Sequence, residues 1–173
     1  MSTTKIKNPA LGAYEAACLM GVHWTRAPKM ALSGEVATRT LLSSTGTDRL
    51  RVYSMQSVNA NWYAYEEALA AGQLSRRPRA NAHMRADMLR ELGQVEQHIE
   101  FEDAIRVWEA AEILGCMPTF VARMAAKGEI VSRRLLSHRE GDSRSLIYSR
   151  SSCLQNVKTY QKSRGPGRPR RGV

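Results

Sequence analysis

Near the start of the chain, two segments with helical spacing of apolar residues are followed by a strand-like segment. Gly21 and Gly34 separate the three segments. Small and apolar residues fill Glu15–Met20 at helical spacing, and Gly21 follows as a helix-ending residue. A second helix is predicted for Trp24–Ser33, where Gly34 ends it in the same way. The segment Val36–Leu42 is rich in β-branched and apolar residues. This part of the chain therefore predicts two short helices followed by a strand.

A turn, a second strand and a third helix complete the pattern. Gly46 and Asp48 favour a turn, and Leu50–Tyr53 predicts the returning strand of a hairpin. Ser57 is expected to cap the third helix. The apolar residues carried by that helix are Val58, Trp62 and Tyr65.

The whole pattern recurs 94 positions later, with one residue inserted before its end. Matching positions include Glu15-Ala16-Ala17 with Glu109-Ala110-Ala111, Gly21 with Gly115, Thr25 with Thr119, Met30-Ala31 with Met124-Ala125, Arg39 with Arg133, Leu41-Leu42-Ser43 with Leu135-Leu136-Ser137, and, after the insertion, Tyr53-Ser54 with Tyr148-Ser149. Chance does not spread matches so evenly, so the chain is an internal duplication. The second copy predicts helices at Trp108–Leu114 and Pro118–Lys127, a hairpin within Ile130–Tyr148, and a last helix capped by Ser151 or Ser152.

Two helices joined by a tight turn and followed by a hairpin are typical of a winged helix-turn-helix. The predicted fold is mainly α with small β-hairpin wings, built as two winged helix-turn-helix units joined by a helical linker. The expected boundaries are an N-terminal arm at 1–12, the first unit at 13–71, a basic loop and linker helix at 72–104, the second unit at 105–162, and a basic tail at 163–173.

Both copies also share a family pattern. The motif E-A-A-x-x-x-G, followed by R/K-M-A-x-x-G-E, resembles the excisionase-like branch of the MerR superfamily over residues 13–65 and 106–160. The resemblance implies sequence-specific DNA binding through the second helix and the wing of each unit. Members of that branch include transcription regulators and recombination directionality factors.

The first copy departs from the pattern at its second helix. Pro28 lies inside the predicted recognition helix, where a proline removes a backbone hydrogen bond and clashes with the preceding turn. The helix is therefore expected to begin late, near Ala27, or to be kinked. Ala27 also replaces the usual larger apolar residue, which is Val121 in the second copy. The first copy is expected to bind DNA differently, or mainly to pair with a partner.

Charge agrees with a polyanionic partner. The formal net charge is +10, and arginine, whose planar fork suits phosphates and guanine edges, predominates among the basic residues. The three cysteines, Cys18, Cys116 and Cys153, have no metal-site spacing, and no secretory signal or run of about 20 apolar residues is present. These features predict a cytoplasmic, nucleoid-associated protein that does not enter a membrane.

The candidate DNA-contacting residues lie on the two second helices and on the wings. On the first helix and the turn before it they are His23, Thr25, Arg26 and Lys29, and on the second helix they are Thr119 and Arg123. Lys29 and Arg123 occupy the same repeat position and are the strongest candidates for base or phosphate contact. The wing candidates are Arg39, Arg49, Arg51, Arg133, Arg134, Arg139 and Arg144.

The C-terminal tail carries a second kind of candidate. Its Gly-Arg-Pro core with flanking basic residues resembles an AT-hook, in which glycine and proline keep the chain slim and extended while arginine enters the minor groove of A·T-rich DNA. The tail candidates are Arg164, Gly167, Arg168, Pro169, Arg170 and Arg171. The alternative is a basic tail with only non-specific attraction to DNA.

The linker has a single apolar stripe. Residues spaced by three or four along a helix from about His83 form it: Met84, Met88, Leu92, Val95 and Ile99. The stripe is expected either to pack on a repeat of the same chain or to form a homodimer.

The leading functional hypothesis is a sequence-specific transcription regulator of bacterial, phage or plasmid origin that binds double-stranded DNA. Two imperfect copies favour an asymmetric or composite site over a perfect palindrome. The alternative is an architectural DNA-binding protein, such as a recombination directionality factor or a plasmid-segregation centromere binder. An enzyme is not expected, and neither a cofactor nor a metal, because the sequence lacks a nucleophile–base pair, a phosphate loop and a metal-ligand cluster.

Overall fold

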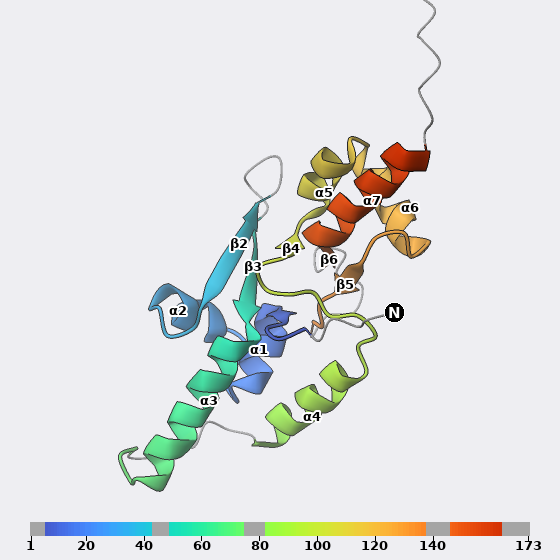
Figure 1. Ribbon diagram of the computed structural model, residues 1–173. Helices are drawn as coiled ribbons and strands as arrows, with labels where there is room; N and C mark the ends of the chain where they lie inside the picture. Colours follow the sequence, from blue (N-terminus) through green and yellow to red (C-terminus); the bar gives the residue numbers. More distant parts are fainter. Residues whose placement is uncertain (1–5, 43–48, 75–81, 138–145, 164–173) are drawn as a thin grey trace, which may run out of the picture.

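The computed structural model describes residues 6–42, 49–74, 82–137 and 146–163. Within these ranges the chain forms seven helices and two three-stranded antiparallel sheets (Figure 1). The coarse expectation of a helix-rich chain with small β elements is compatible with this architecture.

The first half has the order β-α-α-β-β-α. Its elements are β1 (Ala10–Leu11), α1 (Ala13–Leu19), α2 (Ala27–Leu32), β2 (Thr38–Leu42), β3 (Arg49–Ser54) and α3 (Met55–Ala70). The strand order is β1-β3-β2, and Ala10 pairs with Ser54 while Arg39 pairs with Val52. The predicted hairpin is present, and a third strand lies beside it.

The second half repeats this order. Its elements are β4 (Ala104–Ile105), α5 (Val107–Leu114), α6 (Pro118–Ala126), β5 (Ser132–Arg134), β6 (Leu146–Ser149) and α7 (Arg150–Ser163). The strand order β4-β6-β5 is that of the first sheet, and Ala104 pairs with Ser149 as Ala10 pairs with Ser54. The two copies detected in the sequence therefore have the same topology.

The first strand of each sheet differs from the sequence prediction. Residues 1–12 are expected to be an arm, but β1 within them pairs with β3. Likewise β4, which begins at the last residue of the predicted linker, pairs with β6 at Ala104 and Ser149 and at Ile105 and Tyr148. A two-residue strand has no hydrophobic periodicity to detect, and its pairing partner is more than 40 residues away.

The caps of the third helices also differ from the prediction. Ser54 accepts a hydrogen bond from the Ser57 amide at 3.2 Å, and Ser149 accepts one from the Ser152 amide at 3.1 Å. The predicted caps are therefore wrong, because each helix begins directly after its strand. Ser57 and Ser152 instead accept from the Ala37 and Val131 amides, each at 2.8 Å, and so fasten the helix to the start of the hairpin.

Pro28 shortens the second helix of the first half. It lies in the first turn of α2, which begins at Ala27 and has six residues, whereas the equivalent α6 has nine. The late start, rather than a kink, is the observed outcome. Proline is tolerated in a first turn because the amide it lacks has no partner within the helix there.

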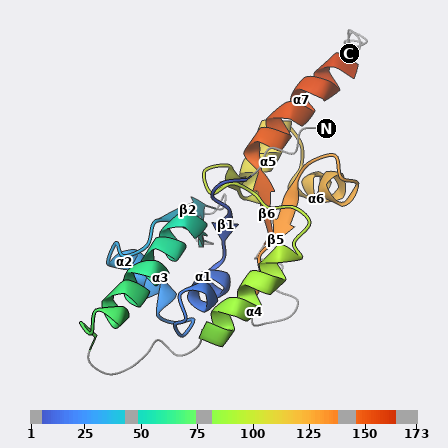
Figure 2. The same ribbon diagram turned by 60° about the horizontal axis from the view of Figure 1, so that its bottom comes forward.

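The linker helix α4 (Ala82–Gly93) packs on the first half of its own chain (Figure 2). Met88 and Leu92 are buried in the core that α1, α2 and β3 form, and Met84 and Val95 pack against the same core. Arg85 adds polar contacts, because its guanidinium donates to the Leu19 carbonyl at 2.6 Å and to Asn59 Oδ1 at 2.9 Å. The intramolecular alternative is therefore the observed one, and the apolar stripe is not available for a homodimer.

A separate core joins the two halves. It contains equivalent residues from both halves together with two residues from the segment before β4: Ala10, Leu41, Val52, Ala104, Leu135, Ile147, Ile99 and Phe101. Backbone hydrogen bonds run antiparallel across the same junction, from the Ala10 amide to the Ile99 carbonyl and from the Phe101 amide to the Asn8 carbonyl, each at 2.8 Å. The halves are thus packed on each other through their sheets.

None of the helices described has both the length and the apolar character needed to cross a lipid bilayer. Across the same residues, no group of three histidine, cysteine, aspartate or glutamate side chains is placed to hold a metal ion.

Two leucines of α4 test the packing of the linker. Leu92→Ala is expected to lower the free energy of unfolding by about 2–5 kcal/mol, because it leaves a cavity in the first-half core. Leu89 lies on the same helix with 41% of its surface exposed, so Leu89→Ala should change it by less than about 1 kcal/mol. Urea unfolding followed by circular dichroism measures both values, and similar losses for the two variants would contradict the packing described.

Candidate nucleic-acid interface

The second helix of each half is anchored by the same two positions. Ala27 and Met30 are buried on α2, and the equivalent Val121 and Met124 are buried on α6. These residues fix one face of each helix against the core. The opposite face of each is left toward solvent.

Basic residues stand on the solvent face of both helices. Arg26 and Lys29 are exposed at α2, and Arg123 and Lys127 are exposed at α6. Lys29 and Arg123 are 94 positions apart, so the duplication places a cation at the same point of both units. This repeated cation is the main feature of the candidate interface.

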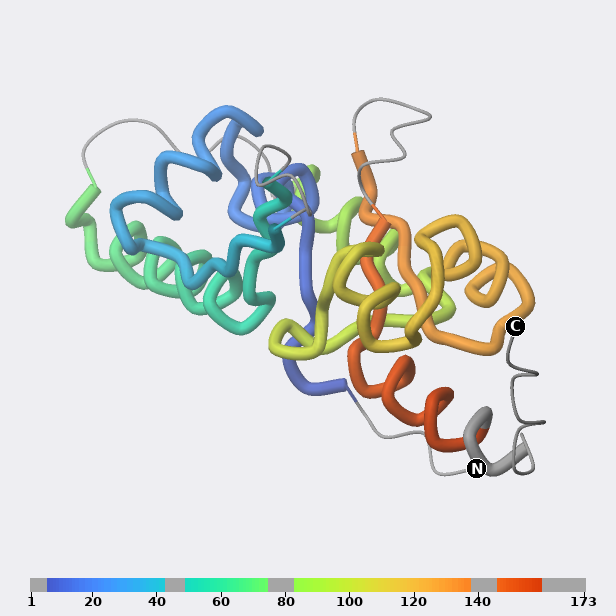
Figure 3. Tube along the Cα trace, turned by 90° about the horizontal axis from the view of Figure 1, so that it is seen from above, coloured from blue at the N-terminus to red at the C-terminus, as the bar shows by residue number. Residues whose placement is uncertain are grey.

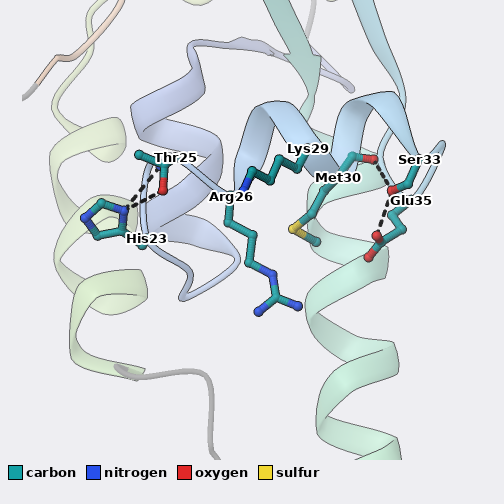
Figure 4. Close-up of a pocket in the computed structure, with 7 residues that line it drawn as sticks. All are labelled: His23, Thr25, Arg26, Lys29, Met30, Ser33 and Glu35. Atoms are coloured by element: carbon teal, nitrogen blue, oxygen red, sulfur yellow. Dashed lines mark hydrogen bonds between the residues drawn. The ribbon is translucent and has the colours of Figure 1, made fainter.

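Each helix also borders a shallow hollow. In the first half the hollow is lined by His23, Thr25, Arg26, Lys29, Met30, Ser33 and Glu35 (Figure 4). In the second half it is lined by Phe120, Arg123, Met124, Lys127, Glu129, Asn156 and Thr159. Five of the lining positions are equivalent between the halves. The two outer helices, α2 and α6, therefore expose equivalent positions to solvent.

Local hydrogen bonds order the turn before α2 and the end of the helix. His23 Nδ1 lies 2.9 Å from Thr25 Oγ1, and the Ser33 hydroxyl donates to Glu35 Oε1 at 2.7 Å (Figure 4). His23 and Thr25 are exposed, as predicted, and so is Thr119 in the second half. These side chains border the two helices without being buried by them.

Two of the predicted wing arginines form hydrogen bonds across the junction between the halves. Arg133 is 3% exposed, and its guanidinium donates to Glu15 Oε1 at 2.6 Å and to the Ala10 carbonyl at 2.5 Å. Arg39 donates to the carbonyls of Phe101, Glu102 and Ala104 in the other half. The assignment of Arg133 to a DNA phosphate is therefore wrong, because its guanidinium is buried between the two halves. Arg39 is half-buried, so its assignment stays a prediction.

Glu15 is the acceptor at the centre of this junction. Its carboxylate also accepts from the Leu136 amide at 2.8 Å and from the Gly12 amide at 2.8 Å. Burial raises the pKa of the Glu15 carboxyl, and the charge of Arg133 and the two amides act against that rise. The repeat-equivalent Glu109 is only half-buried, so the fully buried acceptor Glu15 has no equally buried counterpart in the second half.

The other described wing arginines differ in exposure. Arg49 and Arg134 are exposed. Arg51 is half-buried and donates to the Pro28 carbonyl at 3.4 Å, which ties the hairpin to α2. Arg49 and Arg134 therefore remain candidate phosphate contacts, whereas Arg51 helps to orient the outer helix.

The remaining predicted contacts lie outside the described residues. They are Arg139 and Arg144 of the second wing and Arg164, Gly167, Arg168, Pro169, Arg170 and Arg171 of the tail.

Sequence reasoning missed several residues of the candidate interface. Phe120 is 50% exposed on α6 at the position equivalent to Arg26. Asn156 and Thr159 come from α7 and border the same hollow as Arg123. The repeat alignment could have identified Phe120 as the partner of Arg26, but nothing in the sequence brings α7 beside α6.

The outer helices lie at opposite ends of the molecule. In all three views α2 is at one side and α6 at the other, and the labelled views show strands of both sheets between them (Figures 1, 2 and 3). The junction core thus separates two equivalent surfaces and holds them in one body. Comparison with protein-family models, with curated proteins and with solved structures finds no match for this chain.

The neighbours Arg133 and Arg134 test the reassignment of the wing arginines. Arg133→Ala is expected to lower the free energy of unfolding by about 3–5 kcal/mol, because it leaves the Glu15 carboxylate buried without its cation. Arg134→Ala removes the same charge from an exposed side chain and should change stability by less than about 0.5 kcal/mol. Chemical denaturation measures the free energy of unfolding of both variants. An Arg133→Ala protein as stable as the wild type would contradict the structural role given to the Glu15–Arg133 pair.

Proposed function

We propose that this chain binds double-stranded DNA sequence-specifically through two winged helix-turn-helix units, as a transcription regulator of bacterial, phage or plasmid origin. The observation that supports the proposal is the repeated cation, Lys29 on α2 and Arg123 on α6, on helices that the same pair of buried positions anchors. Both copies carry a cation at this position, although the nearby equivalent residues Arg26 and Phe120 differ in chemistry.

The shape of each unit suits a duplex. An α-helix fits the major groove, where arginine and lysine bond guanine edges or phosphates. The hairpin beside it offers Arg49 in the first half and Arg134 in the second for the phosphates that flank the groove. In this proposal α2 and α6 contact the bases, and the phosphate contacts of the hairpins fix the position of the protein along the duplex.

The tail extends the proposed contact into the minor groove. Arg168, between Gly167 and Pro169, would enter the narrow groove of A·T-rich sequence beside the main site. Because the tail contact depends on groove width rather than on base order, it also favours a second candidate function, architectural binding along DNA. An extended protected array in a footprint would indicate that second function, whereas a short site at a promoter would indicate regulation.

Arg123→Ala tests whether α6 contacts bases in the major groove. It should weaken binding to the selected sequence by about 10-fold or more, and weaken binding to unrelated duplex far less, because a base contact is worth about 1–3 kcal/mol. Arg90→Ala is the control, since it removes the same charge from exposed α4, where Arg90 lies 3.3 Å from Asp87. The measurement is fluorescence anisotropy over a range of salt concentrations.

The salt dependence separates the two kinds of contact. A residue that touches only a phosphate lowers the slope of log K against log salt concentration by about 0.9 when it is removed, and it affects all sequences equally. Equal losses on specific and unrelated DNA would therefore reduce Arg123 to a phosphate contact. If the wild-type protein discriminates no sequence at all, the proposed function is wrong.

Arg168→Ala tests the tail. The variant should bind the selected core with its A·T-rich flanks more weakly, and it should lose the preference for A·T over G·C flanks, because the arginine no longer occupies the narrow groove. Binding of wild type and variant to duplexes that differ only in the flanks measures this preference. A variant that keeps the wild-type preference would leave only a non-specific basic tail.

A further inference from the structure

The junction between the halves has the reciprocal contacts of a two-fold interface. Arg39 of the first half donates to the Ala104 carbonyl of the second, and Arg133 of the second donates to the Ala10 carbonyl of the first. Arg39 and Arg133 are repeat equivalents, and so are Ala10 and Ala104. When residue i contacts residue j and the equivalent of j contacts the equivalent of i, the two units are related by a two-fold rotation.

The core of the junction has the same symmetry. Three of its residues come from the first half, Ala10, Leu41 and Val52, and their equivalents Ala104, Leu135 and Ile147 come from the second. The antiparallel bridge between Pro9 and Glu100 also joins two segments that run in opposite directions. The chain therefore resembles a homodimer whose two subunits have been joined by α4.

This arrangement is held rigidly. The Glu15 and Arg133 side chains are 0% and 1% exposed in their ion pair, so sliding one half over the other would leave a charge buried without a partner. A flexible linker would let two binding units adopt parallel or opposed orientations on DNA. The buried junction allows only the opposed orientation of the two units. In that orientation α2 and α6 are related to each other by the two-fold rotation when they approach a duplex.

The symmetry is imperfect on the surfaces that would read bases. Arg26 at the start of α2 is equivalent to Phe120 on α6, and the two side chains line equivalent hollows. Arginine bonds the O6 and N7 atoms of guanine, whereas an apolar ring contacts the methyl group of thymine. The two units therefore carry different chemistry at one matched position.

We infer that the chain recognises one imperfect inverted repeat, with one half-site for each unit, and that the half-sites differ by guanine opposite Arg26 and thymine opposite Phe120. This inference rests on the proposed function. It specifies the orientation and the asymmetry of the DNA site, neither of which a pair of loosely tethered units would have.

Selection of random duplexes with the full chain is the first experiment. The enriched sequence should contain two half-sites in inverted orientation, with matching positions occupied by guanine in one and thymine in the other. Reversing one half-site in place, which makes a direct repeat of the same composition and spacing, should weaken binding by about 30-fold or more, because several base contacts of one unit are lost. Equal binding to the inverted and direct arrangements would overturn the inference.

A substitution at Phe120 tests the asymmetry. Selection with Phe120→Arg should replace thymine by guanine in one half-site only, so that the enriched site becomes more symmetric. Phe120→Leu is the control, since it keeps an apolar contact and should keep the thymine. Because Phe120 is half exposed, both variants are expected to fold, which circular dichroism checks. A change in both half-sites, or in neither, would overturn the assignment.

The outcomes separate this inference from the proposed function. If selection enriches no sequence, the proposed sequence-specific function fails, and the inference fails with it. If it enriches a direct repeat, or a single half-site that one unit alone accounts for, sequence-specific binding stands and only the two-fold arrangement is wrong.

Discussion

The ion pair between Glu15 and Arg133 constrains the whole molecule. A charge removed from water is costly unless its hydrogen bonds are replaced, and this carboxylate accepts from Arg133, Gly12 and Leu136. The acceptor lies in the first half, while Arg133 and Leu136 lie in the second. Only one placement of the halves satisfies this set, and the apolar residues packed around the junction add the favourable burial that keeps water out.

Basic residues at two repeat positions have different roles, one in the junction between the halves and one on the exposed helices α2 and α6. The position shared by Arg39 and Arg133 holds the halves together, and the position shared by Lys29 and Arg123 faces solvent. Both positions carry basic residues in both copies, but only Arg39 and Arg133 form hydrogen bonds across the junction. Arg39 and Arg133 direct their terminal guanidinium nitrogens to carbonyls and, for Arg133, to a carboxylate of the protein. Lys29 and Arg123 instead present their donors to solvent.

The linker helix completes the first half rather than merely connecting it to the second. Met88 and Leu92 fill the core beneath α1, and Arg85 bonds the Leu19 carbonyl near the end of that helix while its guanidinium lies 5.1 Å from the centroid of the Trp62 ring. Among the described residues, no equivalent of α4 packs in the core of the second half, which contains residues of β4, α5, α6 and β6 with Cys153 of α7. The two copies share one topology but differ in what covers them.

The amino-acid sequence by itself determined the duplication, the order of helices and hairpin in each copy, and the candidate cations Lys29 and Arg123. These features are local: a period of 3.6 or 2 residues, a glycine that ends a helix, and a repeat offset can all be read along the chain. Only the tertiary structure decided that β1 and β4 complete the sheets, that the linker stripe packs inside its own chain, and that Arg133 is buried while Arg134 is exposed. The reason is that each of these depends on a partner far away in sequence, as Arg133 depends on Glu15 118 positions before it. A contact between residues so far apart in the sequence leaves no local pattern from which it could be predicted.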